Sequence, residues 1–245
     1  MNIGSEMQEI SSNNKRIAKN TVSLYIRMLV TMFVGLYTSR VVLQTLGVAD
    51  FGIYNVVGGI VTMCVFISNT LSSASQRFFA FEIGRNDTVQ LRKVFSASLF
   101  IYVAFVLVIL ILAETVGRWF VENKLNIPPS REAAAYFVYH FSVLSFLSSI
   151  IRVPYNALII ARERMGFYAW ISIVEAALKL LIVYLLVWLS FDKLKLYAVL
   201  MFFVVFLITL IYVVYCRIKF YECRVIAAKD KCLYVSLFQF AGWNL

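Results

Sequence analysis

The stretch VFSASLFIYVAFVLVILILA, residues 94–113, contains no charged side chain. A helix needs about 20 apolar residues to cross a bilayer core that is about 30 Å thick, because each residue adds about 1.5 Å. This stretch meets that requirement by itself. It predicts that the protein is embedded in a membrane.

Similar apolar stretches lie on both sides of this one, separated by polar connectors. Hydrophobic residues occupy 62% of the 245 positions and charged residues only 15%, whereas soluble domains contain about 25% charged residues. We therefore expect an all-α membrane protein with six transmembrane helices. The expected spans are roughly residues 21–39, 53–73, 94–113, 134–160, 169–189 and 196–215.

The polar segments divide the chain into four expected parts. Residues 1–20 would form a cytoplasmic N-terminal segment, residues 21–215 the six-helix lobe and residues 216–232 a basic cytoplasmic loop. Residues 233–245 have the pattern of the first turns of a seventh span. Half a span leaves backbone groups without hydrogen-bond partners in lipid, so we expect this chain to be a piece of a longer protein.

The basic residues of the connectors predict the orientation. If six spans cross the membrane, the connectors on the side of the N-terminus carry fourteen basic residues and those on the opposite side carry six. Cytoplasmic loops are enriched in Lys and Arg, so we expect a cytoplasmic N-terminus. The fourteen are Lys15, Arg16, Lys19, Arg77, Arg85, Arg92, Lys93, Arg162, Arg164, Arg217, Lys219, Arg224, Lys229 and Lys231, and the six are Arg40, Arg118, Lys124, Arg131, Lys193 and Lys195.

Four charged residues fall inside the expected spans, namely Arg27, Arg152, Glu175 and Lys179. Each costs about 2.5–3.5 kcal/mol at the centre of a membrane helix, so such residues usually face a cavity or a partner. They are our candidates for lining a substrate cavity. Because three of the four are basic, they predict an anionic cargo.

Each candidate also has an interpretation without a ligand. Arg27 lies about 12 Å into the first span and either lines a cavity or makes a contact between helices. Glu175 and Lys179 are four residues apart and share a helix face, so they either neutralise each other or Glu175 tunes a lysine that meets the substrate. Arg152 lies nearer the cytoplasmic end of its span, where snorkelling to the interface explains it.

Several other functions are excluded by the motifs. We find no Gly-rich phosphate loop, no G-x-S-x-G and no H-E-x-x-H, so we expect no enzyme and no cofactor. His140 is the single histidine, and the four cysteines lack the spacing of a zinc site, so we expect no bound metal and reduced, structural cysteines. The net charge of +10 is explained by topology-setting loops, and we expect no nucleic acid partner.

The N-terminal part of the chain resembles a known transporter family. The pattern is Ser39-Arg40, Leu43 and Leu46-Gly47, followed by a short turn at Phe51-Gly52-Ile53-Tyr54. It is similar to the start of Wzx-type polysaccharide flippases, including O-antigen and lipopolysaccharide biosynthesis proteins of the MOP superfamily, which also contains the MATE drug exporters. The segments SASQRFFAFEIGR and VPYNALIIARERMGFYAWISIVEAALKLLIVYLL share the resemblance.

The resemblance implies a MATE-like fold of two six-helix lobes around a central cavity. This chain would supply the N-terminal lobe and the start of the seventh helix, and the missing C-terminal lobe would be its partner. The implied cargo is an oligosaccharide linked to undecaprenyl pyrophosphate, moved across the bacterial inner membrane. Cationic cavity residues would hold the pyrophosphate, and Arg27 and Lys179 are the plausible counterparts.

Other functions remain open at this stage. A MATE-like multidrug exporter shares the fold, but it is expected to carry acidic residues in its spans without basic partners. A polysaccharide polymerase or ligase would use long outer loops containing Arg and His, whereas the longest outer loop here, about residues 114–132, has no His. A membrane remnant that transports nothing, or a partner in polysaccharide assembly, is the third alternative.

Overall fold

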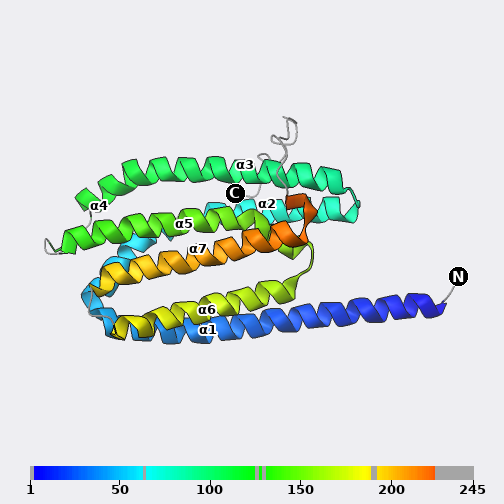
Figure 1. Ribbon diagram of the computed structural model, residues 1–245, viewed down its shortest axis with the longest axis horizontal. Coiled ribbons are helices and arrows are strands. Elements are labelled where there is room, and N and C mark those ends of the chain that lie inside the picture. The colour runs from blue at the N-terminus through cyan, green and yellow to red at the C-terminus, as the bar shows by residue number, and fades with distance from the viewer. Residues whose placement is uncertain (1–2, 63–64, 125–126, 129–130, 189–191, 224–245) are drawn as a thin grey trace.

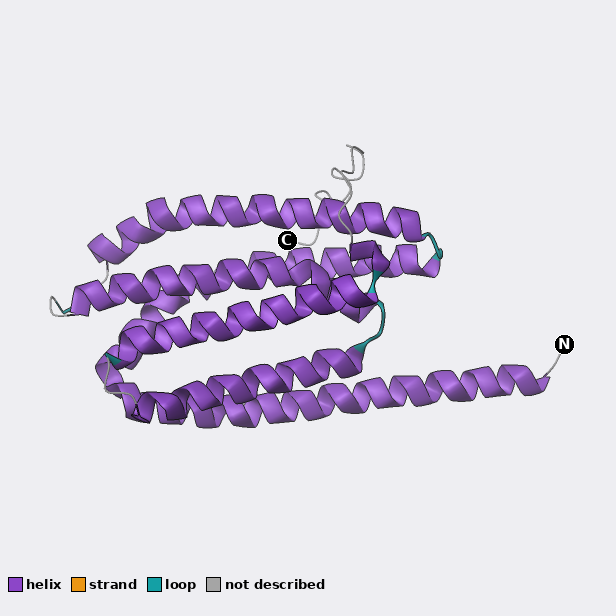
Figure 2. Cartoon of the chain, in the orientation of Figure 1, coloured by secondary structure: helices purple, strands orange, loops and turns teal. Residues whose placement is uncertain are grey.

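The computed structural model describes residues 3–62, 65–124, 127–128, 131–188 and 192–223. Nearly all of these residues are helical, and none of them forms a strand (Figure 2). The elements in chain order are α1 (Ile3–Thr62), α2 (Val65–Gly84), α3 (Thr88–Leu112), a π turn (Ala113–Gly117), α4 (Arg118–Lys124), α5 (Glu132–Ala161), α6 (Met165–Trp188), α7 (Lys193–Lys219) and a 3-10 turn (Tyr221–Cys223). The expected all-α class is confirmed.

Several helical stretches are long and apolar enough to cross a membrane. In the described part of the chain there are five, and each expected span from residues 94–113 onward coincides with one of them. The expected span at residues 53–73 is divided between the end of α1 and the more polar α2, so this criterion does not establish six spans. The five stretches are Ile17–Gly59, Thr88–Lys124, Glu132–Ala161, Met165–Trp188 and Lys193–Lys219.

The first reversal of the chain lies at Gly47. Its φ of 80° and ψ of 167° interrupt the helical geometry of α1, and only glycine adopts such angles without strain. The chain turns back at this point (Figure 1). We expected the turn at Phe51–Tyr54, which was wrong, because those residues are helical and the turn falls on the preceding glycine.

The connectors also differ from the expected bounds. The chain stays helical beyond residue 113 to Lys124, through the π turn and α4, where we expected an outer loop from residue 114. The last span was expected to end at Tyr215, and α7 continues to Lys219. The rest of the expected basic loop beyond residue 223 and the expected start of a seventh span lie outside the described residues.

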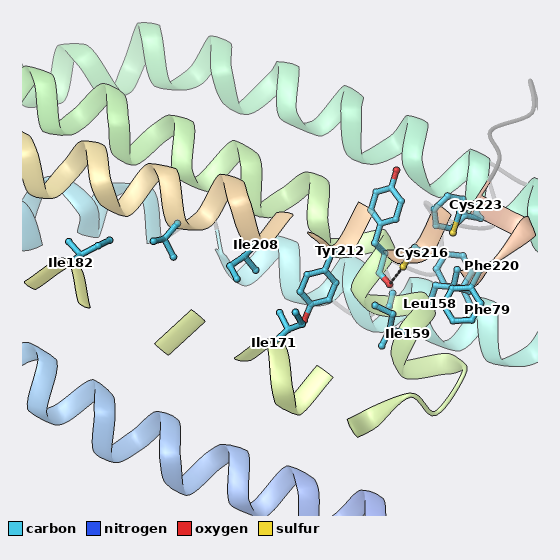
Figure 3. Close-up of a cluster of buried hydrophobic side chains, with 14 of the residues drawn as sticks. Phe79, Leu158, Ile159, Ile171, Ile182, Ile208, Tyr212, Cys216, Phe220 and Cys223 are labelled. Carbon is cyan, nitrogen blue, oxygen red and sulfur yellow. Dashed lines mark hydrogen bonds between the residues drawn. The ribbon is translucent and has the colours of Figure 1, made fainter. Parts of the chain in front are cut away.

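The helices pack as an elongated bundle in which α5 is central. It contacts α7, α2, α3 and α1, while α1 packs mainly along α6 (Figure 1). A cluster of fully buried side chains joins α2, α5 and α7, including Phe79, Leu158 and Ile208 (Figure 3). Lipid is as apolar as these side chains, so the cluster stabilises the bundle mainly through close packing.

The two ends of the bundle are held by different ion pairs. At one end Arg162, after α5, pairs with Glu222 in the 3-10 turn, and the α2–α3 turn lies at the same end (Figure 1). At the other end Arg131 contacts both Asp50 and Asp192. The described connectors therefore gather at the ends in the way the loop charges predict, while the cytoplasmic assignment stays a prediction.

Candidate functional site

The four charged residues inside the spans gather at two neighbouring cavities. Arg27 lies on α1, Arg152 on α5, and Glu175 and Lys179 on α6. Two of these helices, α5 and α6, follow one another in the chain, whereas α1 is distant from both. The fold brings all four to one region, because α6 lies between α1 and α7 and also contacts α5 (Figure 1).

Glu175 binds two cations at once. Its Oε1 lies 2.8 Å from Lys179 Nζ, and its Oε2 lies 3.0 Å from Arg152 Nη1. The contact with Lys179 is the one expected from the four-residue spacing. The contact with Arg152 joins α6 to α5, and it replaces the expected snorkelling because the carboxylate on the neighbouring helix gives the guanidinium a partner inside the bundle.

Arg27 has a different environment. Its guanidinium carbon lies 4.4 Å from the centre of the Tyr168 ring, so the cation rests on an aromatic face. Its buried Nε has no hydrogen-bond partner, and among the described residues no carboxylate lies within ion-pair distance of it. The positive charge of Arg27 is therefore not neutralised by a direct contact in the described part of the chain.

The larger hollow, which we call the central cavity, has a volume of about 480 Å³. It lies among α1, α5, α6 and α7, and Arg152, Glu175 and Lys179 contribute to its wall. Five of the other residues in the wall carry hydroxyl or amide groups, and the rest of the wall is apolar. The five are Tyr54, Asn55, Ser142, Ser145 and Ser149.

The second hollow, the α1–α6 cavity, has a volume of about 450 Å³. Arg27, Thr31 and Thr38 line it from α1, and Glu175 and Lys179 from α6. Glu175 and Lys179 therefore belong to the walls of both cavities. The buried Thr38 Oγ1, like Arg27 Nε, has no hydrogen-bond partner, so two polar groups in this cavity wall are unsatisfied.

The site lies deep along the helices and is positively charged. Glu175 is ten residues from the start of α6 at Met165, which corresponds to about 15 Å, or half of the hydrocarbon core. Three cations and one carboxylate leave two net positive charges. Such charges are costly at this depth, and an anion bound between them would offset that cost.

The sequence analysis did not identify three serines and one tyrosine as residues of the site. Ser142, Ser145 and Ser149 follow helical spacing in α5, so their common face could have been recognised. Ser145 and Ser149 donate to backbone oxygens of Phe141 and Phe146, which leaves their hydroxyl oxygens able to accept. Tyr168 gave no such signal, because its contact with Arg27 depends on how α6 packs against α1.

The remaining candidates lie away from the cavities. His140 Nε2 is 3.6 Å from Glu114 Oε1 and its Nδ1 is 2.8 Å from the Tyr136 backbone oxygen, so its ring contacts α5 and the π turn rather than a cavity. Cys216 and Cys223 are free and buried. Within the described ranges, no group of His, Cys, Asp or Glu has the arrangement of a metal site. Cys64 and Cys232 lie outside the described residues.

Comparison with known protein families, with curated proteins and with solved structures finds no match to this chain.

Proposed function

We propose that this chain forms the N-terminal lobe of a MATE-like two-lobed transporter in the bacterial inner membrane. The whole protein would move an oligosaccharide linked to undecaprenyl pyrophosphate from the cytoplasmic to the outer leaflet. The observation that carries the proposal is the gathering of Arg27, Arg152, Glu175 and Lys179 at two cavities deep in the bundle.

The chemistry of the two cavities fits the two parts of such a cargo. Basic side chains favour phosphate oxygens, because hydrogen bonds to charged groups are stronger than neutral ones. Ser142, Ser145 and Ser149 line the central cavity, where their hydroxyl oxygens could accept hydrogen bonds from sugar hydroxyls. A polar head group would thus meet basic and hydroxyl groups within the apolar layer.

The six-span count and the orientation belong to this proposal. The chain turns back at Gly47, and residues 48–62 and α2 return toward the end where α1 begins (Figure 1). If they form one crossing, the lobe has six crossings in alternating directions. The basic residues at the N-terminal end then support a cytoplasmic N-terminus.

A MATE-like multidrug exporter is the alternative with the same fold. Its usual cargo is cationic, and two net positive charges at the cavities would repel such a molecule. The charge of the site therefore favours an anionic cargo over a cationic drug.

Replacing Arg27 by Ala in the intact protein tests the proposal. We expect loss of surface polysaccharide while the protein level in the membrane is unchanged, because the variant loses the cation that has no carboxylate partner among the described residues. Surface polysaccharide is measured by gel staining of extracted glycan, and protein level by immunoblot.

Arg118→Ala is the matched control. Arg118 is exposed and pairs with Glu122 within α4, away from both cavities, so this variant should export normally. Normal export by Arg27→Ala would contradict the site. Increased drug sensitivity of cells without the protein, with unaltered polysaccharide, would favour the drug exporter instead.

A further inference from the structure

Among the described residues that line the two cavities, Glu175 is the one acidic residue. Its side chain is 19% exposed, and each of its oxygens contacts a different cation. A phosphate group presents the same kind of oxygen to the same donors. The carboxylate therefore occupies the position that an anionic ligand would need in order to contact Arg152 and Lys179.

We propose that Glu175 is a built-in counter-anion, which holds Arg152 and Lys179 while the cavities are empty and is displaced by the phosphate groups of the cargo. The inference rests on the proposed function in one respect, namely that the cargo is anionic. The inference gives Glu175 a role in selecting and releasing the ligand. Without that role, Glu175 would only neutralise Arg152 and Lys179.

Competition with Glu175 selects for ligands of high charge. A carboxylate carries one negative charge, so a singly charged ligand gains little by replacing it. A diphosphate carries more charge and more oxygens, and it can contact Arg152 and Lys179 together. Arg27 gives the incoming anion a first contact, because no carboxylate among the described residues binds it.

Displacement also changes the packing of the bundle. The Arg152–Glu175 ion pair joins α5 to α6, whereas the Lys179–Glu175 pair lies within α6. Moving the carboxylate away from Arg152 removes that link between the helices. Since α1 packs mainly along α6, the empty and occupied states would differ in how the α1–α6 pair is tied to the rest of the lobe.

Glu175→Gln tests the proposal, because glutamine keeps the size of the side chain and removes its charge. The full chain is purified into lipid nanodiscs, and binding of radiolabelled inorganic pyrophosphate and inorganic phosphate is measured. We expect Glu175→Gln to bind pyrophosphate about tenfold more tightly than the wild type, and to bind phosphate measurably, because its cations have no internal competitor.

Two control variants separate this effect from a general change of charge. Glu175→Asp keeps the negative charge on a shorter side chain, so it should bind pyrophosphate less tightly than Glu175→Gln does. Glu114→Gln makes the same change of charge at a half-exposed position beside His140, away from the cavities, and should have no effect. Unchanged or weaker pyrophosphate binding by folded Glu175→Gln would overturn the proposal.

A measurement on the wild type keeps the proposal testable if Glu175→Gln does not fold. Infrared difference spectra should show a shift of a carboxylate band when pyrophosphate is added, because Glu175 exchanges its cations for other surroundings. An unaltered carboxylate region at saturating pyrophosphate would overturn the displacement step.

The outcomes also distinguish this proposal from the transport proposal. Tighter binding by Glu175→Gln in a protein whose deletion leaves surface polysaccharide intact would support the counter-anion and overturn the flippase. Loss of export by Arg27→Ala with no effect of Glu175→Gln would overturn only the counter-anion. If neither the wild type nor Glu175→Gln binds pyrophosphate, the counter-anion proposal and the transport proposal are both overturned.

Discussion

The hydroxyl group of Tyr139 on α5 stabilises an irregular turn in the neighbouring helix. It donates to the backbone oxygen of Ala113 over 2.8 Å, at the start of the π turn Ala113–Gly117. A π turn disturbs the regular hydrogen bonds of an α-helix, and Tyr139 gives the Ala113 carbonyl a second donor beside the Arg118 backbone N–H. Gly117 gives the ring its space, because a Cβ at this position would overlap the tyrosine oxygen.

Gly117→Ala should therefore destabilise the protein by about 2–3 kcal/mol, through overpacking and loss of the tyrosine hydrogen bond. Unfolding in detergent, followed by circular dichroism, measures the change. Tyr139→Phe should cost only about 1 kcal/mol, since it removes the hydrogen bond alone. In the double variant the two costs should be less than additive, because the overlapping oxygen is absent. A harmless Gly117→Ala would show that the turn adapts freely.

The sequence predicted best the elements whose apolar residues alone identify a membrane-spanning helix. The helices α3, α5, α6 and α7 each contain a long apolar stretch, and burial of the backbone in lipid requires a helix there. The region around Gly47 was harder to predict. Polar residues on both sides of the reversal, such as Arg40 and Asp50, are helical, so hydropathy marks a loop where the structure reverses at a single glycine.

Contacts within one helix of the candidate site could be predicted from the sequence, whereas contacts between helices could not. The Glu175–Lys179 pair follows from helical spacing, which relates neighbours in one element. The Arg152–Glu175 pair joins residues of α5 and α6, and no period in the sequence fixes how two helices face each other.

Arg131, which precedes α5, holds three elements together at the end opposite the N-terminus. Its Nη2 lies 3.1 Å from Asp50 Oδ2 and its Nη1 lies 3.4 Å from Asp192 Oδ1. Asp50 follows the kink in α1, and Asp192 caps α7 by accepting from the Leu194 backbone. The side chain of Asp50 is only 11% exposed, so it depends on Arg131 more than Asp192 does.

Arg131→Gln should destabilise the protein by about 1–2 kcal/mol, because a nearly buried Asp50 loses its charged partner while the half-exposed Asp192 turns to water. Adding Asp50→Asn should recover part of this loss in the same detergent unfolding assay. Arg118→Gln is the control, since its exposed pair with Glu122 should contribute less than about 1 kcal/mol. Equal effects of the two arginine variants would refute a special role for Arg131.

At the scale of the whole molecule, the elongated bundle has two ends whose polar groups are kept apart by the apolar helices. The α2–α3 turn lies at the end where α1 begins, and α4 lies at the other end (Figure 1). If the bundle spans the membrane, these two sites face opposite aqueous compartments. Asn14 on α1, Asn86 in the α2–α3 turn and Asn123 in α4 are exposed at these places.

Cysteine labelling of these three positions tests both the orientation and the return crossing of residues 48–84. The four native cysteines are first replaced by alanine, and Asn14→Cys, Asn86→Cys and Asn123→Cys are then made one at a time. A membrane-impermeant maleimide should label Asn123→Cys in intact cells, but Asn14→Cys and Asn86→Cys only after the membrane is opened, because basic connectors stay on the cytoplasmic side.

Labelling of Asn86→Cys in intact cells, with Asn14→Cys protected, would mean that residues 48–84 do not cross. The reverse pattern at all three positions would keep the crossings and invert the orientation, and the proposed cargo would then meet its basic cavity from the other side.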